Sequence, residues 1–341
     1  MRLFRTSPMK KYDKNSIENI TPDKFNIVNS CNGLLCLSDP YTENPLVICN
    51  PVTGECIRLP KATKAPFKLK THADRVRMQR HSGLGFQPKT NEYKVIKMSV
   101  FERVILEVNT LGSPSWRNVE VDPRISISSL KYPTCVNGVL HWIKLEGQER
   151  SILCICFESE RLQPFPSPPH VFEIHDNRHT ISMGELKGFI YICDLNFSFV
   201  TMWVMNEYGI EESWTNVYNI ETSVDSWSSF SWHYGLCWPV KPFEEGAAIL
   251  LYHSCNCFVY YEPEKYRCKV FQIRGTRSTY IGVIPHIPSL ISLKDIVKGG
   301  DNNEVLSIHS RCAKYKLPED NEVLFLAQVF VRDLVSKDET T

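Results

Sequence analysis

An apolar strand, a polar turn and a second strand recur five times along this chain, and no other feature restricts the fold as strongly. The residues that open the five turns are Asn50, Asn109, Phe157, Asn206 and Glu262, which lie 59, 48, 49 and 56 residues apart. A period of about 50 residues with several strands in each unit is typical of a kelch-like β-propeller, because one blade cannot bury its faces alone. The sequence therefore predicts one all-β domain, a kelch-like β-propeller of about six blades.

Each unit contains turns whose residue types suit unusual backbone angles. An Asn-Gly dipeptide accepts positive φ at low cost and predicts a tight hairpin turn. An Asn-Pro pair fixes φ early in a turn, and a following Gly supplies a left-handed residue at its end. We expect these residues to shape the backbone rather than to bind a partner. They are Asn32, Gly33, Asn50, Pro51, Asn137 and Gly138.

Tryptophans occupy related places in several units. Trp116 and Trp214 each follow a Ser and begin the last strand of a unit. We expect both to be buried between neighbouring sheets, because large aromatic side chains dominate the cores of such folds. Trp142 and Trp203 belong to the inner strands of their units and are predicted to be structural as well.

The composition is that of an ordinary globular protein and excludes several partners. The 341 residues carry a net charge of +1 and are 43% hydrophobic, so the total charge predicts neither nucleic-acid binding nor membrane binding. The apolar runs are much shorter than the ~18 residues that a membrane helix needs. The first residues do not form the apolar core of a signal peptide. We therefore expect an intracellular protein, cytoplasmic or nuclear.

Thirteen cysteines are an odd number, which argues against a complete disulfide framework. Several of them lie in apolar, strand-like runs. We expect small buried side chains in a reducing compartment rather than disulfides. Zinc is not expected, because no Cys-x-x-Cys pair is matched by a second pair of ligands.

Two long loops leave alternatives open. Lys61–His81 holds seven basic residues and one acid, so it is either a solvated loop or a docking patch for an acidic partner. Pro164–Thr180 holds three histidines, but its prolines disfavour the helix that would bring two of them to one metal ion. We favour the solvated loop in both places and expect no metal and no cofactor.

The residue pattern at both ends of the chain differs from that of the predicted propeller. Residues 1–28 are basic and polar, and supply either a strand that closes the ring or a loose tail. The propeller is predicted over 29–296, where Tyr280–Lys294 is expected to be its last strand and closing turn. Residues 297–341 form a tail in which helical spacing of apolar residues predicts a helix over 319–336.

No catalytic motif is present. The chain has no G-x-S-x-G elbow, no H-E-x-x-H and no phosphate-binding glycine loop, so we expect no enzyme activity and no catalytic residues. His141 lies in a strand without a nucleophile beside it, and is expected to be a histidine of the core or of a blade boundary. The alternative is a propeller enzyme whose residues converge from separate blades.

An ordered set of segments resembles the associated interaction domain of plant F-box proteins over roughly residues 29–296. The segments are S-C-N-G-L-L-C-L, I-C-N-P-V-T-G-E-C-I-R-L-P, G-F-Q-P-K-T-N-E-Y-K-V-I-K-M, S-W-R-N-V, V-N-G-V-L-H-W-I, M-W-V-M-N-E-Y-G-I-E-E-S-W-T and S-L-I-S-L-K. The resemblance implies a kelch-like propeller that recognises protein substrates for an SCF-type E3 ubiquitin ligase. It does not identify the substrate or the residues that bind it.

One part of the family pattern does not match. The family carries a helical F-box before this domain, which docks the adaptor subunit of the ligase, and residues 1–28 lack its leucine-proline opening. Binding of the adaptor is therefore expected only if an F-box is supplied elsewhere. An F-box-less or truncated relative that binds targets without ubiquitination is the alternative.

Overall fold

A computed structural model describes residues 2–4, 26–39, 43–61, 78–125, 127, 129–146, 149–169, 171–172, 180–196, 199–221, 236–243, 248–254, 257–265, 267–272, 284, 286–297, 305–307, 311–316 and 323–328. Structural statements below concern these residues.

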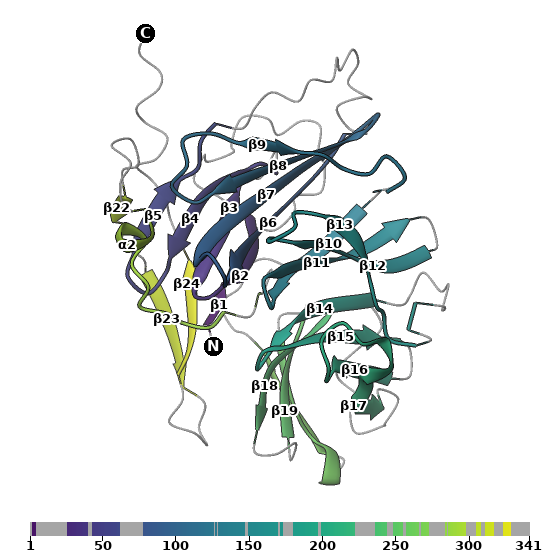
Figure 1. Ribbon diagram of the computed structural model, residues 1–341. Coiled ribbons are helices and arrows are strands. Elements are labelled where there is room, and N and C mark those ends of the chain that lie inside the picture. Colours follow the sequence, from purple (N-terminus) through teal and green to yellow (C-terminus); the bar gives the residue numbers. More distant parts are fainter. Residues whose placement is uncertain are drawn as a thin grey trace, which may run out of the picture.

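Five antiparallel sheets, here called blades 1 to 5, follow one another along the chain (Figure 1). In each, the four strands pair in the order of the sequence. The strands are β2–β5 (Asn26–Cys31, Leu34–Ser38, Pro45–Asn50, Glu55–Arg58), β6–β9 (Gln79–Gln87, Glu92–Val100, Val104–Thr110, Arg117–Val119), β10–β13 (Ser129–Val136, Val139–Glu146, Glu149–Cys156, Leu162–Phe165), β14–β17 (Thr180–Leu186, Phe189–Leu195, Phe199–Met205, Trp214–Glu221) and β18–β21 (Cys237–Phe243, Ala248–His253, Cys257–Glu262, Arg267–Gln272).

The first strands of the blades gather at the centre of the assembly. Strand β10 contacts β2, β6 and β14, and β14 also contacts β18. This arrangement confirms the predicted β-propeller. The five repeated turns that predicted it all begin at or next to the end of the third strand of a blade, because the repeat is the blade itself.

Each boundary between consecutive blades has its own apolar core. Burial of apolar area there stabilises the ring by about 25 cal/mol per Å². Trp116, Leu84 and Ile57 lie in the core between blades 1 and 2, and Trp142 lies in the core between blades 2 and 3. Separate clusters fill the boundaries between blades 3 and 4 and between blades 4 and 5. Because each core needs two sheets, the blades are stable only together.

The tight turns follow the predicted chemistry. Asn32 and Gly33 have φ of 45° and 86°, and Asn137 and Gly138 have φ of 52° and 75°. Positive φ at both turn residues matches the right-handed twist of the strands that they join. Asn50 opens its turn by accepting hydrogen bonds from the backbone of the next residues through Oδ1, at 2.8 Å from the Val52 nitrogen.

The two ends of the chain also form strands, outside the predicted domain limits of 29 and 296. β22 (Val305–Ser307) pairs antiparallel with β5 and gives blade 1 a fifth strand. β1 (Arg2–Phe4) pairs parallel with β24 (Val323–Gln328), which pairs antiparallel with β23 (Arg311–Lys316). The described strands thus form five blades of four or five strands each. A separate sheet of three strands is formed by the two ends of the chain.

The predicted helix over 319–336 is wrong where the structure describes it, because Val323–Gln328 forms strand β24. The run V-L-F-L-A-Q is short and apolar, and periodicity alone cannot distinguish a buried strand from a helix in such a run. Pairing with two other strands decides the conformation.

The predicted last strand over Tyr280–Lys294 is also wrong in its described part. Residues 286–292 form no strand, and α2 (Leu293–Ile296) is a short helix. The segment nevertheless belongs to the propeller, since Leu293 is fully buried in the core between blades 1 and 2. Among the described helices, none is long and apolar enough to cross a membrane.

The described cysteines agree with the expectation of buried thiols. Eleven are free, and eight of these are buried. Burial raises the pKa of the Cys154 thiol to about 12, so it remains protonated at neutral pH.

Candidate protein-binding face

A central channel runs between the blades and holds a cavity of about 810 Å³. Its described walls are the first strands of blades 1, 3, 4 and 5, together with Ile284, Ile287 and Pro288. Tyr132 of blade 3 and Trp238 of blade 5 meet edge to face across it, with ring centroids 6.3 Å apart. Burial raises the pKa of Tyr132 to about 12, as expected for a hydroxyl in an apolar wall.

One face of the propeller carries two turns from each blade. In an antiparallel meander, the turn after the first strand and the turn after the third strand lie at the same end of the sheet. We call this end of the ring the turn face. It includes the turns Asn32-Gly33, Asn137-Gly138 and Lys187-Gly188, all of which border the channel.

Segment 286–297 covers the blade 1 part of the turn face. A Cβ placed on Gly33 would lie 2.2 Å from the Ser289 Cβ, so the segment rests directly on this turn. The Asn50 Nδ2 donates hydrogen bonds to the carbonyl oxygens of Ser289 at 3.0 Å and Ile291 at 2.7 Å. The Glu55 carboxylate accepts a 2.7 Å hydrogen bond from the Leu293 nitrogen. Asn50 is therefore an anchor for this segment as well as a turn residue.

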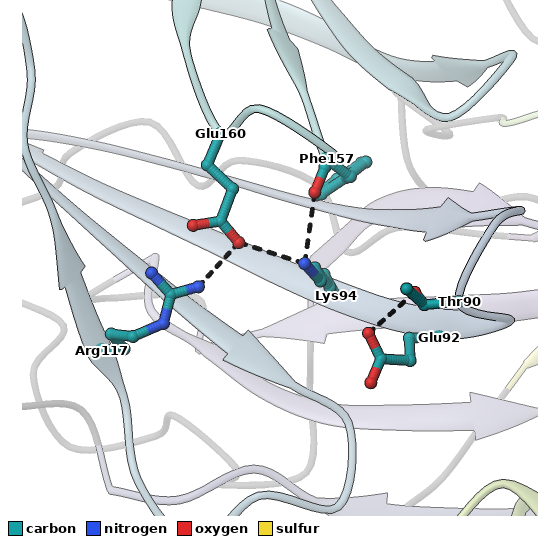
Figure 2. A network of polar contacts seen from close by, with 6 residues as sticks. All are labelled: Thr90, Glu92, Lys94, Arg117, Phe157 and Glu160. Atoms are coloured by element: carbon teal, nitrogen blue, oxygen red, sulfur yellow. Dashed lines mark hydrogen bonds and ion pairs between the residues drawn. The ribbon is translucent and has the colours of Figure 1, made fainter.

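At the boundary between blades 2 and 3, the turn after β12 lies over blade 2. Phe157 is fully buried against Gly85, and Lys94 donates to the Phe157 carbonyl at 3.2 Å (Figure 2). The Glu160 carboxylate accepts hydrogen bonds from Lys94 at 3.1 Å and from Arg117 at 2.6 Å. Burial alone would raise the pKa of Glu160, but the hydrogen bonds from Arg117 and Lys94 outweigh it and lower that pKa.

At the boundary between blades 3 and 4, the turn after β16 covers blade 3 in the same way. Its Tyr208 hydroxyl lies 2.8 Å from Nε2 of the fully buried His141, whose Nδ1 lies 3.2 Å from the Thr134 carbonyl. Phe165 packs against both rings. Burial lowers the pKa of His141 to about 4, so the imidazole is neutral at physiological pH. The expectation of a histidine at a blade boundary is confirmed.

The boundary between blades 4 and 5 differs, because a groove of about 350 Å³ lies there. Phe189 and Val217 line it and are 45% and 44% exposed. From blade 5, Pro263 reaches the groove at the start of the 3₁₀ turn η4 (Pro263–Lys265). Leu186 and Lys187 line both this groove and the channel, so the two hollows are neighbours on the rim.

Trp116 and Trp214, which occupy equivalent places in blades 2 and 4, each contact the preceding blade. Trp116 is 9% exposed and donates from Nε1 to the Pro60 carbonyl of blade 1 at 3.0 Å. Trp214 is 5% exposed and donates from Nε1 to the Pro166 carbonyl after blade 3 at 3.3 Å. Both are buried between sheets, as the sequence predicted.

The other predicted structural residues occupy blade cores and turns. Trp142 is buried between blades 2 and 3, and Trp203 is half-buried against the core between blades 3 and 4. Gly138 lies against Pro88 of the neighbouring blade, and Pro51 is buried in its turn. The sequence identified residues that build the blades, but none of the residues at the open groove.

The described residues contain no group of three or more side chains suited to a metal ion. The histidine-rich part of loop 164–180 and most of loop 61–81 lie outside the described residues, so both predictions for these loops stay predictions.

The fold defines the class of protein. It is a β-propeller whose turn face is partly covered by segment 286–297 of the same chain. The matching family is described as "F-box associated beta propeller domain", and the match covers residues 3–292. The chain belongs to this family.

Several Arabidopsis thaliana proteins are similar to the chain. It is 25% identical to F-box protein At3g07870, over 76% of this chain and 69% of that protein. It is 24% identical to putative F-box protein At5g50220, over 72% and 63%, and 28% identical to putative F-box protein At1g53550, over 64% and 56%. The chain thus spans between about half and two thirds of the length of these relatives.

Proposed function

We propose that this chain is the target-binding part of an F-box protein, a module that holds a protein substrate for an SCF-type E3 ubiquitin ligase, and that it has no enzyme activity of its own. The observation that carries the proposal is the family match over residues 3–292. The named relatives are F-box proteins, and the adaptor-binding F-box would have to be supplied outside the matched propeller.

The turn face supports a binding role. Loops and turns held by a rigid scaffold are where propellers and similar folds carry their binding residues. Here the inter-blade hydrogen bonds of Trp116 and Trp214 fix the scaffold, while the rim next to blade 4 leaves apolar side chains exposed. The contact of His141 with Tyr208 across the blade boundary supports a structural role for this histidine. We also propose an intracellular location, for which the free, buried cysteines are the support.

The test is reconstitution with a fused F-box. The chain is expressed in plant cells, captured proteins are identified, and each candidate is retested as a purified protein against the purified chain. A genuine target should bind directly, and should be ubiquitinated in a reconstituted ligase only when an F-box is fused ahead of the chain. Direct binding without ubiquitination by the fusion would contradict the ligase role, and chemical turnover of a bound molecule would contradict the binding role.

A further inference from the structure

Three of the five innermost strands contain a β-bulge, and each bulge lies at the wall of the central channel. The residues that the pairing with the second strand of the blade leaves out are Val28 in β2, Tyr132 and Pro133 in β10, and Val240 in β18. All of them line the channel. The innermost strands β6 and β14 pair without such a shift. A bulge turns side chains away from their regular direction and is common next to binding sites.

The bulge of blade 3 places a strained residue at the channel. Tyr132 has φ of 56°, a left-handed conformation that bulky residues rarely adopt. Such backbone persists where the surrounding structure holds it, and it is common at ligand sites. The ring of Tyr132 meets the ring of Trp238 edge to face, with centroids 6.3 Å apart. Trp238 belongs to the bulged strand of blade 5, so two bulged strands bring two aromatic rings together at the channel.

These two side chains carry hydrogen-bond donors that no described residue uses. Neither the Tyr132 hydroxyl nor the Trp238 Nε1 has a hydrogen-bond partner among the described residues, and neither atom is fully buried. Burial of the ring raises the pKa of Tyr132 to about 12, so its hydroxyl keeps its proton at neutral pH. An indole N–H can only donate, and a largely buried phenol or indole usually finds a partner. The channel thus offers two neighbouring donors to an acceptor oxygen.

The rest of the described channel wall is mostly apolar and carries no net charge. Its charged residues are Glu185 and Lys187, which have opposite signs, and the Glu185 carboxylate accepts a hydrogen bond from the Gly188 nitrogen. A charged group enters an apolar site only at a high cost unless it is paired there. A cavity of about 810 Å³ with apolar walls and few polar groups is typical of a small-molecule site. The wall therefore favours an uncharged compound.

We propose that the central channel binds a small, uncharged ring compound that carries a carbonyl oxygen. The carbonyl oxygen accepts hydrogen bonds from the Tyr132 hydroxyl and the Trp238 Nε1, and the two aromatic rings contact the ring system of the compound. Val28 and Val240, on the bulges of blades 1 and 5, contact its apolar part. Because the wall combines residues of several blades, an occupant stabilises the whole ring against unfolding. This inference goes beyond the proposed function, since it concerns a small molecule and needs no protein target.

The experiment uses propionyl-dimethylaminonaphthalene, an uncharged fluorescent ketone whose emission moves to shorter wavelength in apolar surroundings. Fluorescence titration of the full chain gives its Kd, and thermal unfolding gives the shift that it causes in the midpoint. Two comparison probes are the same naphthalene with a propyl group in place of the propionyl group, and the anion anilinonaphthalene sulfonate. The channel variants are Tyr132→Phe and Trp238→Phe. The matched controls are Tyr218→Phe and Val217→Asp, which change side chains of the blade 4–5 groove instead.

We expect wild type to bind the ketone saturably, with shortened emission wavelength and a raised thermal midpoint. Tyr132→Phe and Trp238→Phe should each weaken binding about threefold to tenfold, because each removes one hydrogen bond. The propyl probe and the sulfonate should bind wild type more weakly than the ketone, and Tyr132→Phe should not weaken the propyl probe further. Both groove controls should bind the ketone as wild type does. Without a probe, Tyr132→Phe should keep the wild-type midpoint, because the lost hydroxyl has no described partner.

Absence of saturable ketone binding by wild type would overturn the proposal. A Kd that Tyr132→Phe leaves unchanged, or that Val217→Asp raises, would overturn it as well, since the ketone would then lie elsewhere. Equal affinity for the ketone and the propyl probe would show that no donor recognises the carbonyl oxygen, and tighter binding of the sulfonate would show that the channel takes anions; either result would contradict the proposal. Because these measurements contain no protein target, their failure leaves the proposed function standing, and failure of target binding leaves this site standing.

Discussion

Two turns on the rim of the channel have the same backbone conformation and opposite surroundings. Asn32-Gly33 has φ of 45° and 86°, and Lys187-Gly188 has φ of 52° and 86°. Ser289 lies against the first turn, whereas a Cβ on Gly188 would meet no atom within 4 Å. Local sequence fixes each turn, but the chain that crosses it decides whether it is covered. The same face therefore has a covered side at the blade 1 turn and an open side at the blade 4 turn.

The largest effect is expected at a covered boundary, from Trp214→Ala. Removing a buried Trp side chain costs about 3–5 kcal/mol, a large share of the ~5–15 kcal/mol that stabilises a domain. The variant should have a strongly lowered midpoint in thermal and denaturant unfolding. Trp214→Phe keeps an aromatic ring but loses the hydrogen bond to Pro166, and should cost about 1 kcal/mol. An unchanged midpoint for Trp214→Ala would show that this boundary is not held by the core.

Gly33→Ala should have the next largest effect, because it acts on the covered turn. A non-glycine residue in the left-handed region costs about 1–2 kcal/mol, and overpacking adds typically about 1–3 kcal/mol. The new Cβ would lie 2.2 Å from the Ser289 Cβ. Denaturant unfolding measures the loss, and Ser289→Gly in the same chain should recover part of it. Failure of Ser289→Gly to recover any stability would show that segment 286–297 does not press on this turn.

A pH titration of stability tests the covered boundary between blades 3 and 4 without a large structural change. Burial lowers the pKa of His141 to about 4, below the ~6.5 of an unfolded histidine. The unfolded state therefore binds the proton first as the pH falls, so stability is lost below about pH 6.5 at about 1.4 kcal/mol per pH unit. His253, with its pKa lowered to about 4 by burial, adds a second loss of the same sign.

The control for the titration is His141→Gln, which cannot titrate. Its stability should fall about half as steeply as that of wild type between pH 6.5 and 5, a window above the usual pKa of carboxylates. Equal slopes for the two proteins would contradict burial of a neutral His141 at this boundary.

The blades could be predicted from sequence because each is a local meander. An asparagine recurs at Asn50, Asn109 and Asn206 because each blade has a turn after its third strand. The Asn-Gly pairs predict the positive φ that their turns adopt. The burial of Trp116 and Trp214 also followed from their equivalent places. These features depend on residues that are close together in the chain, so they can be predicted from the sequence.

The open groove and the terminal sheets could not be predicted in the same way. Phe189 and Val217 look like ordinary strand residues, and their exposure depends on Pro263 and η4, a short turn some fifty residues further along the chain. Val323–Gln328 has the apolar pattern of either a helix or a strand, and its pairing with Arg2–Phe4 joins opposite ends of the chain. Segment 286–292 runs beside β2 without strand pairing, so no strand-like period marks it.

Gly188→Ala should have the smallest effect and sharpens the comparison of the two turns. Its φ of 86° costs the new alanine about 1–2 kcal/mol, and the reduced freedom of the unfolded chain returns about 0.4–1 kcal/mol. Because no atom lies near the new Cβ, no packing cost is added. The net loss in denaturant unfolding should be about 1 kcal/mol or less. The difference between Gly33→Ala and Gly188→Ala then measures the contact with Ser289, since the backbone strain is common to both. If the two variants lost equal stability, the contact of segment 286–297 with the rim would contribute nothing, and the covered side of the turn face would be as available to a partner as the open side.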